Sequence, residues 1–146
     1  MHISLVAMEV TAALAIERFR DPDLAVQCAL LHDTLEDTAT TYAQLASAFG
    51  PRVADGARAL SKDESLPKAE RMADSLRRIR EQPHEVWIVK LADRITNLQP
   101  PPAHWPADKR ARYRDEAGEI ARVLGPASPY LDRRIQDKIS AYARYL

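Results

Sequence analysis

The first residues whose types and spacing could support chemistry form the segment HDTLED at positions 32–37, directly after an apolar run. Residues four apart share one face of a helix, so we expect His32 to lie above Glu36. The same spacing places Asp33 above Asp37. Carboxylates crowded in a poorly solvated site repel one another and take up protons unless a cation neutralises them. For this segment alone, a solvated helix end with a chance His-Asp pair is the alternative interpretation.

The second group of such residues is the segment VKLADRITN at positions 89–97, where Asp93 lies within the most apolar helix expected in the chain. A buried aspartate needs a partner. Arg94 is one candidate, but adjacent residues point to different sides of a helix. A metal ion shared with His32 and Asp33 is the better candidate. Imidazole and carboxylate groups without cysteine suit Mn, Fe, Co or Zn better than Ca or Mg.

Helices must position both groups, because the chain has only 4 glycines and 2 phenylalanines and its apolar residues recur with helical spacing. Asp21-Pro22 is typical of a helix start, and Gly50-Pro51 ends one helix and opens the next. The sequence therefore predicts an all-α fold. The expected helices cover residues 2–19, 22–35, 42–48, 51–60, 67–80, 84–98, 107–124 and 129–145.

The composition limits the partners of the chain. Its 21 basic and 21 acidic residues give a net charge of zero, which argues against nucleic-acid binding. No stretch approaches the roughly 20 apolar residues of a membrane span, no secretion signal is recognisable, and no glycine-rich phosphate loop is present. The single cysteine, Cys28, is expected to be buried, and a reducing cytoplasm is the expected location. The sequence carries no signal for a particular oligomeric state.

Taken together, the two segments resemble the HD hydrolase domain of the RelA/SpoT proteins, and in particular the small single-domain alarmone hydrolases of that family, which include an animal SpoT homologue. The resemblance extends from about residue 2 to Tyr113. It is carried by ALLHDT at 29–34 followed by EDT, by LPKAER at 66–71 and by KLADR at 90–94.

This resemblance implies an all-helical HD-domain bundle that binds one divalent metal ion, usually Mn²⁺. It also implies a guanine nucleotide as substrate. The 3′-pyrophosphate of guanosine tetraphosphate or pentaphosphate would be hydrolysed, giving GDP or GTP and pyrophosphate.

The resemblance also assigns roles by position. The metal ligands it implies are His2, His32, Asp33 and Asp93. The catalytic acid/base pair it implies is Glu36 and Asp37. The residues it implies for nucleotide binding are Lys68, Asn97 and Tyr113, and Lys62 is a further candidate cation for the phosphates.

One departure concerns the start of the chain. The family carries another helix and a basic Arg-Lys-Gly segment before the first histidine ligand, and in this sequence that histidine is residue 2. We therefore expect residues 1–146 to form a single HD-type phosphohydrolase domain that begins later than its relatives do.

Three alternatives belong to different classes of protein. The first is an HD phosphohydrolase acting on another nucleotide or phosphate ester, because a fold does not fix a substrate. The second is a non-catalytic nucleotide-binding or regulatory module, which has no need of the acidic pair Glu36 and Asp37. The third is a helical interaction protein, which leaves a buried Asp93 unexplained.

Overall fold

Prolines or capping side chains open most helices of the computed structural model, which describes residues 1–146. The Asp21 side chain accepts a hydrogen bond from the backbone N–H of Leu24 at 3.1 Å, as expected for an N-cap. Gly50 has a φ of +92°, a conformation that glycine adopts without strain, and Pro51 begins the next helix immediately afterwards. These local signals explain why the helix boundaries could be predicted closely.

The predicted all-α fold is confirmed. None of its helices combines the length with the apolar character that a membrane-spanning helix requires. The predictions for 51–60 and 107–124 match the observed helices, whereas the helix expected over 2–19 is shorter and the one over 67–80 opens with a 3-10 turn. The elements in order are α1 (His2–Ile16), α2 (Pro22–Leu31), α3 (Thr34–Asp37), α4 (Tyr42–Phe49), α5 (Pro51–Leu60), η1 (Lys68–Glu70), α6 (Arg71–Arg80), α7 (His84–Asn97), α8 (Ala107–Leu124), η2 (Gly125–Ala127), α9 (Pro129–Tyr142) and η3 (Ala143–Tyr145).

The helix predicted over residues 22–35 is interrupted, so this prediction was wrong at its C-terminal end. α2 stops at Leu31, and the short turn α3 begins at Thr34. The His32 ring donates a hydrogen bond to the Ala29 carbonyl at 2.8 Å, and the Thr34 hydroxyl donates to the Leu31 carbonyl at 2.7 Å. Such side-chain bonds to the backbone compete with continuation of a helix. α2 and α3 are therefore separate helical segments, although the Asp37 N–H still donates to the Asp33 carbonyl at 2.9 Å, one turn before it.

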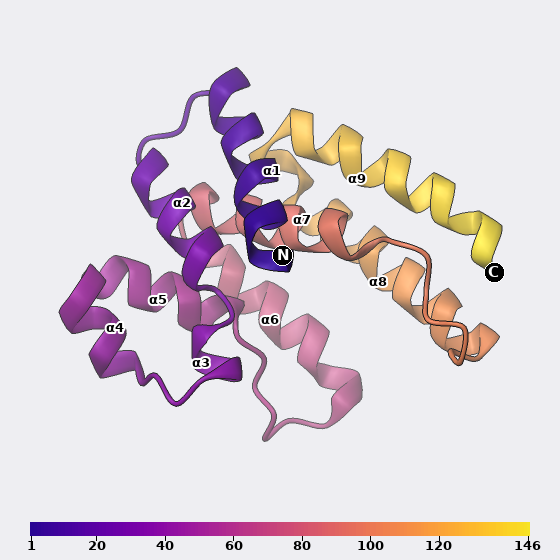
Figure 1. The fold of residues 1–146 in the computed structure, drawn as a ribbon, viewed down its shortest axis with the longest axis horizontal. Coiled ribbons are helices and arrows are strands. Elements are labelled where there is room, and N and C mark those ends of the chain that lie inside the picture. The colour runs from indigo at the N-terminus through magenta and orange to yellow at the C-terminus, as the bar shows by residue number, and fades with distance from the viewer.

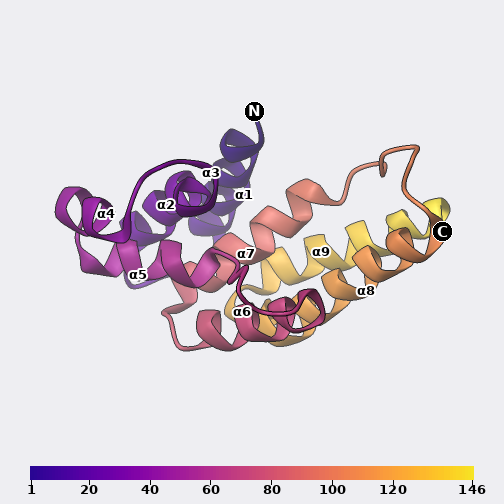
Figure 2. The same cartoon turned by 90° about the horizontal axis from the view of Figure 1, so that it is seen from below.

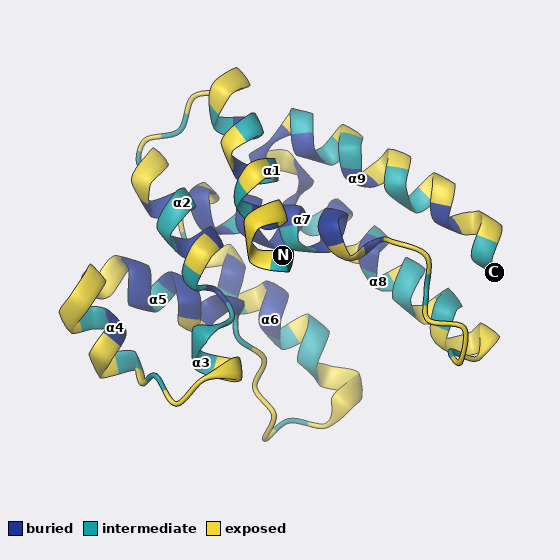
Figure 3. Cartoon of the chain, in the orientation of Figure 1, coloured by how far each residue is buried: buried dark blue, intermediate teal, exposed yellow.

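α7 forms the centre of the molecule and contacts α1, α2, α8 and α9 (Figures 1 and 2). Figure 3 shows much of α7 in the colour of buried residues, and Ile88, Leu91 and Ile95 are at most 1% exposed. Burying a side chain of this size contributes about 1.5–3 kcal/mol of transfer free energy. α7 is therefore a firmly held support for the polar residues in its second half.

α1 carries His2 at its first position and is tied to the C-terminal helix pair. The Glu9 carboxylate accepts a hydrogen bond from Arg134 Nε at 2.7 Å. Glu17 directly follows the last residue of α1, and its carboxylate accepts a hydrogen bond from the Ser128 hydroxyl. Ser128 is fully buried. These contacts fix the direction of α1 across α7.

Candidate metal centre

Three helices bring the four predicted metal ligands together. His2 opens α1, His32 and Asp33 follow the end of α2, and Asp93 lies in α7. His2 Nε2 is 2.9 Å from Asp93 Oδ1, and His32 Nε2 is 3.7 Å from the same oxygen. His32 Nε2 is also 3.2 Å from Asp33 Oδ1. Two imidazoles and two carboxylates from distant parts of the sequence therefore share one small space.

The orientation of the His32 ring tests whether this space suits a metal ion. His32 Nδ1 bonds to the Ala29 carbonyl, which can only accept, so a neutral ring presents the lone pair of Nε2. That Nε2 is buried and has no hydrogen-bond partner, although the carboxylates of Asp33 and Asp93 face it. A lone pair facing carboxylates requires a proton or a cation between them. A backbone carbonyl on the other ring nitrogen is also the usual arrangement of a metal-binding histidine.

The pKa shifts of the clustered side chains also indicate a site for a proton or a cation. Burial opposes the charge of Asp93, but the hydrogen bond with His2 and the nearby His32 ring outweigh it and hold the Asp93 pKa far below its usual range. The hydrogen bond to Asp93 raises the pKa of His2. Burial disfavours the charged His32 ring, yet the interactions with Asp93 and the Ala29 carbonyl raise its pKa. These shifts mean that a bound cation competes with protons for the two imidazole rings.

The donor set fits one divalent ion. His2, His32 and Asp33 each offer one ligand atom, and these atoms lie within 4.8 Å of one another. Asp93 adds a second carboxylate through its contact with His2. All four donors are nitrogen or oxygen atoms, the set that suits a first-row transition metal rather than a thiolate-bound ion.

Arg94 does not neutralise Asp93, which settles an alternative that the sequence left open. Its guanidinium lies over the Tyr113 ring, 4.3 Å from the centroid, and 3.5 Å from a carboxylate oxygen of Glu116. The cation beside Asp93 is instead Lys90, whose Nζ is 3.9 Å from Asp93 Oδ2. Lys90 is 8% exposed, and burial lowers its pKa.

A cavity of about 190 Å³ opens onto the cluster. Three of its lining residues are cations, namely Lys62, Lys90 and Arg94. A concave site with several cations favours an anion that carries several charges. Neither Lys90 nor Arg94 was predicted from the sequence as a cation of the site, and Arg94 was considered only as a partner of Asp93, although two cations flanking Asp93 were a usable signal. The lining as a whole consists of His2, His32, Asp33, Glu36, Leu60, Lys62, Lys90, Asp93, Arg94, Asn97 and Tyr113.

Three of the predicted catalytic and nucleotide-binding residues line this cavity. The Asn97 amide donates to Asp93 Oδ1 at 3.1 Å. Tyr113 is half-buried under Arg94, and burial raises its pKa. Glu36 reaches the cavity from α3.

Two other predicted residues are not part of the lining. Asp37 is exposed at the end of α3, one position beyond Glu36. Lys68 is exposed on η1. α3 therefore directs the Glu36 carboxylate towards the cavity and leaves the Asp37 carboxylate in solvent. The roles predicted for Asp37 and Lys68 stay predictions.

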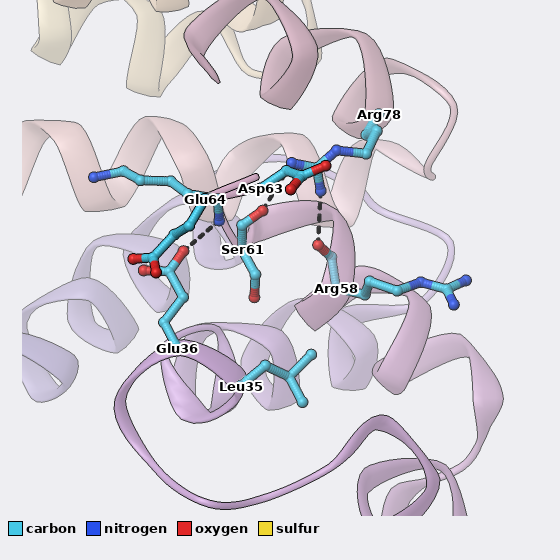
Figure 4. A pocket seen from close by; sticks show the side chains of 8 residues that line it. Leu35, Glu36, Arg58, Ser61, Asp63, Glu64 and Arg78 are labelled. Carbon is cyan, nitrogen blue, oxygen red and sulfur yellow. Dashed lines mark hydrogen bonds between the residues drawn. The ribbon is translucent and has the colours of Figure 1, made fainter. Parts of the chain in front are cut away.

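A second, larger cavity of about 570 Å³ adjoins the first and shares Glu36 and Lys62 with it. Figure 4 shows that side chains from α3, from the end of α5 with the loop after it, and from α6 surround this space. Glu36 therefore stands at the boundary between the metal cluster and a roomier compartment.

Comparison with known proteins identifies the class. The sequence profile described as "HD domain" matches residues 2–125 of this chain. The chain therefore belongs to the HD domain family. The all-helical structure agrees with that membership, and the cluster of His2, His32 and Asp33 could hold the metal ion on which HD phosphohydrolases depend.

Particular relatives are similar over most of this chain. Guanosine-3′,5′-bis(diphosphate) 3′-pyrophosphohydrolase MESH1 of Danio rerio is 36% identical over 115 residues, covering 76% of this chain and 64% of the relative. The Homo sapiens MESH1 protein is 30% identical over 120 residues, covering 77% and 65%. A solved structure described as a metazoan ortholog of SpoT that hydrolyses ppGpp superposes with a TM-score of 0.81 at 26% identity, covering 99% of this chain and 81% of that one. The chain thus spans a little under two thirds of the length of these two MESH1 relatives.

Proposed function

We propose that this chain is a metal-dependent phosphohydrolase that removes the 3′-pyrophosphate of guanosine tetraphosphate or pentaphosphate and releases GDP or GTP. One observation carries the proposal: a metal-ligand cluster and a carboxylate face the cations Lys62, Lys90 and Arg94 in one cavity. Such a site suits a substrate with several phosphate charges. The names of the MESH1 relatives support the choice of substrate.

We assign one Mn²⁺ ion to His2, His32, Asp33 and Asp93, in keeping with a ligand set of imidazole and carboxylate. A bound divalent ion supplies a water molecule of lowered pKa and neutralises charge on the attacked phosphate. The nucleophile needs a proton acceptor at hand.

Glu36 is our candidate for that acceptor, because its carboxylate lies in the lining beside the ligands. Lys90 compensates the charge of Asp93, and Lys62 and Arg94 offer positive charge to the phosphates. Asn97 orients Asp93 and stays within reach of the nucleotide. Tyr113 offers a flat apolar surface to a base or ribose.

The remaining assignments are part of the same proposal. Asp37 would assist Glu36, and Lys68 would approach the phosphates from η1. Residues 1–146 would act as one HD-type domain. We place the reaction in a reducing cytoplasm, since the single cysteine, Cys28, is buried and unpaired.

Product analysis tests the substrate and the bond that is cleaved. Purified protein is incubated with guanosine tetraphosphate and Mn²⁺, with a chelator as the control, and the products are separated by ion exchange. We expect GDP and pyrophosphate in equal amounts, with none in the chelator. Release of single phosphates would instead assign the site to another phosphate ester. A folded, Mn-loaded protein that yields no product would refute the proposal.

A further inference from the structure

The loop that joins α5 to η1 makes direct contact with the proposed proton acceptor. The backbone N–H of Lys62 donates a hydrogen bond to the Glu36 carboxylate (Figure 4). Glu36 is otherwise exposed at the edge of a four-residue turn, so α3 alone gives its side chain little support. The orientation of the Ser61–Lys62 peptide therefore decides where this carboxylate points.

The same peptide is held from its other side by Arg78 of α6. Arg78 Nη2 donates to the Ser61 carbonyl at 2.8 Å, and Nη1 donates to the carbonyls of Arg58 at 2.8 Å and Ala59 at 3.1 Å. Arg58 and Ala59 lie in the last turn of α5 and Ser61 is its C-cap, so Arg78 caps this helix end, where the Arg58 carbonyl also accepts from the Ser61 N–H at 3.2 Å. Figure 4 shows the guanidinium of Arg78 reaching across the cavity to this helix end.

The carbonyl of Ser61 and the N–H of Lys62 belong to one peptide unit. A peptide unit is planar and trans, so its oxygen and its hydrogen point in opposite directions. This unit lies between a guanidinium on one side and a carboxylate on the other. Any rotation of the unit that loosens one hydrogen bond loosens the second as well.

We propose that Arg78 is a positioning residue that orients Glu36 through the Ser61–Lys62 peptide. The inference rests on the proposed function, in which Glu36 accepts a proton. Arg78 does not line the metal cavity, and it acts only through the backbone that it holds. Its planar group makes three carbonyl contacts at once, which a lysine ammonium at the same position cannot reproduce with the same geometry.

Two neighbouring arginines, Arg71 and Arg77, allow the proposed role of Arg78 to be distinguished from general support of the fold. Arg71 holds the far end of the loop, donating to the carbonyls of Glu64 and Leu66 at 3.0 Å each. Arg77 pairs with Asp74, as Arg78 does, but it has no hydrogen bond to the loop. Arg77→Gln is therefore a matched control that removes an Asp74 ion pair and leaves the Ser61–Lys62 peptide in place.

The experiment compares Arg78→Lys and Arg78→Gln with Arg77→Gln. Turnover of guanosine tetraphosphate with Mn²⁺ is measured, and the exchange rate of the Lys62 amide hydrogen is followed by NMR. A displaced proton acceptor costs about ten- to a hundredfold in rate, so we expect that fall in kcat for both Arg78 variants. We expect KM and the Mn²⁺ affinity to stay within about twofold of wild type, and Lys62 to exchange faster.

Arg78→Lys keeps the charge opposite Asp74, so it is the variant that decides the matter if Arg78→Gln fails to fold. An unchanged kcat in Arg78→Lys, or an equal loss in Arg77→Gln, would overturn the inference. If wild-type protein does not hydrolyse guanosine tetraphosphate, the proposed function fails separately. The inference is then judged by exchange alone, and an unchanged Lys62 exchange rate in Arg78→Lys overturns it.

Discussion

Asp93 keeps a negative charge inside the largely buried helix α7 because its neighbours compensate it. His2 Nε2 contacts one oxygen of the Asp93 carboxylate and Lys90 Nζ lies near the other. His32, just after the end of α2, faces the oxygen that His2 contacts. Removing one partner from such a group leaves the others charged and poorly solvated, which costs more than the pairing itself contributes. The residue is therefore important to the metal-free protein as well as to the metal site.

Asp93→Asn is predicted to lower the free energy of unfolding of the metal-free protein by about 3 kcal/mol, because Lys90 loses its counter-charge. The variant should also gain no stability from Mn²⁺. Urea denaturation with and without Mn²⁺ measures both effects. Asp108→Asn, at an exposed ion pair with Arg112, is the control and should leave the urea midpoint close to that of wild type. Equal urea midpoints for Asp93→Asn and wild type would contradict the assignment.

The stability of the metal-free protein and the extra stability that Mn²⁺ adds should change in opposite directions as the pH rises. The raised pKa values of His2 and His32 stabilise the metal-free protein at acidic pH, and this contribution is lost as the pH rises through those values. The lowered pKa of Asp93 adds stability above the pKa of about 3.9 of an unfolded aspartate, which is lost only in stronger acid. Mn²⁺ competes with the protons, so the rise in Tm caused by Mn²⁺ should grow from about pH 6 to about pH 8. Thermal unfolding at several pH values tests this, and a pH-independent rise would count against histidine ligands.

At the scale of elements, α5 packs closely against α2 and α7 at Gly56. A Cβ added there would lie 2.6 Å from Cys28 Sγ and 3.1 Å from Val86 Cγ2. Gly56→Ala should therefore destabilise the protein by about 1–3 kcal/mol through overpacking. Gly118→Ala in α8 meets nothing within 4 Å and should stabilise the helix by up to about 1 kcal/mol. We expect urea denaturation to show a loss of stability for Gly56→Ala and a gain for Gly118→Ala. Equal effects of the two substitutions would show that α5 can shift without cost.

The helices could be predicted where local residues set their ends, as Gly50-Pro51 does for α5. The break after α2 could not, because it depends on the His32 ring bonding back to Ala29. Helix propensity does not report this bond, and the buried His32 ring that makes it also faces Asp93 of α7. The break also explains why Glu36 lines the cavity while Asp37 faces solvent, a distinction that the sequence did not contain.

The roles of the cations in the cavity could not be predicted from the sequence either. Lys90 precedes the predicted ligand Asp93 by three positions and Arg94 follows it directly, but their roles depend on where α1 and α8 pack against α7. His2 could be proposed as a ligand only from the family resemblance. Its contact with Asp93 spans 91 positions of the chain and exists only once α1 lies across α7.

At the scale of the whole molecule, the proposed metal ligands come from α1, α7 and the segment after α2, so the proposed site exists only in the folded chain. An ion that binds the folded state alone stabilises it, by about 2.7 kcal/mol at a concentration a hundredfold above its Kd. We predict that Tm rises with Mn²⁺ concentration and that His2→Ala reduces the rise, because this ligand ties α1 into the site. A rise that is the same in His2→Ala and wild type would show that α1 does not contribute.

The most direct test of the proposed hydrolase is Mn-dependent turnover of guanosine tetraphosphate by wild type and by the His32→Ala/Asp33→Ala double variant. His104→Ala, at an exposed histidine outside the cavity, is the control. We predict turnover in wild type and His104→Ala, and a loss of at least about a hundredfold in the folded double variant. Undiminished turnover in that double variant would contradict the assignment of the metal centre to this cluster.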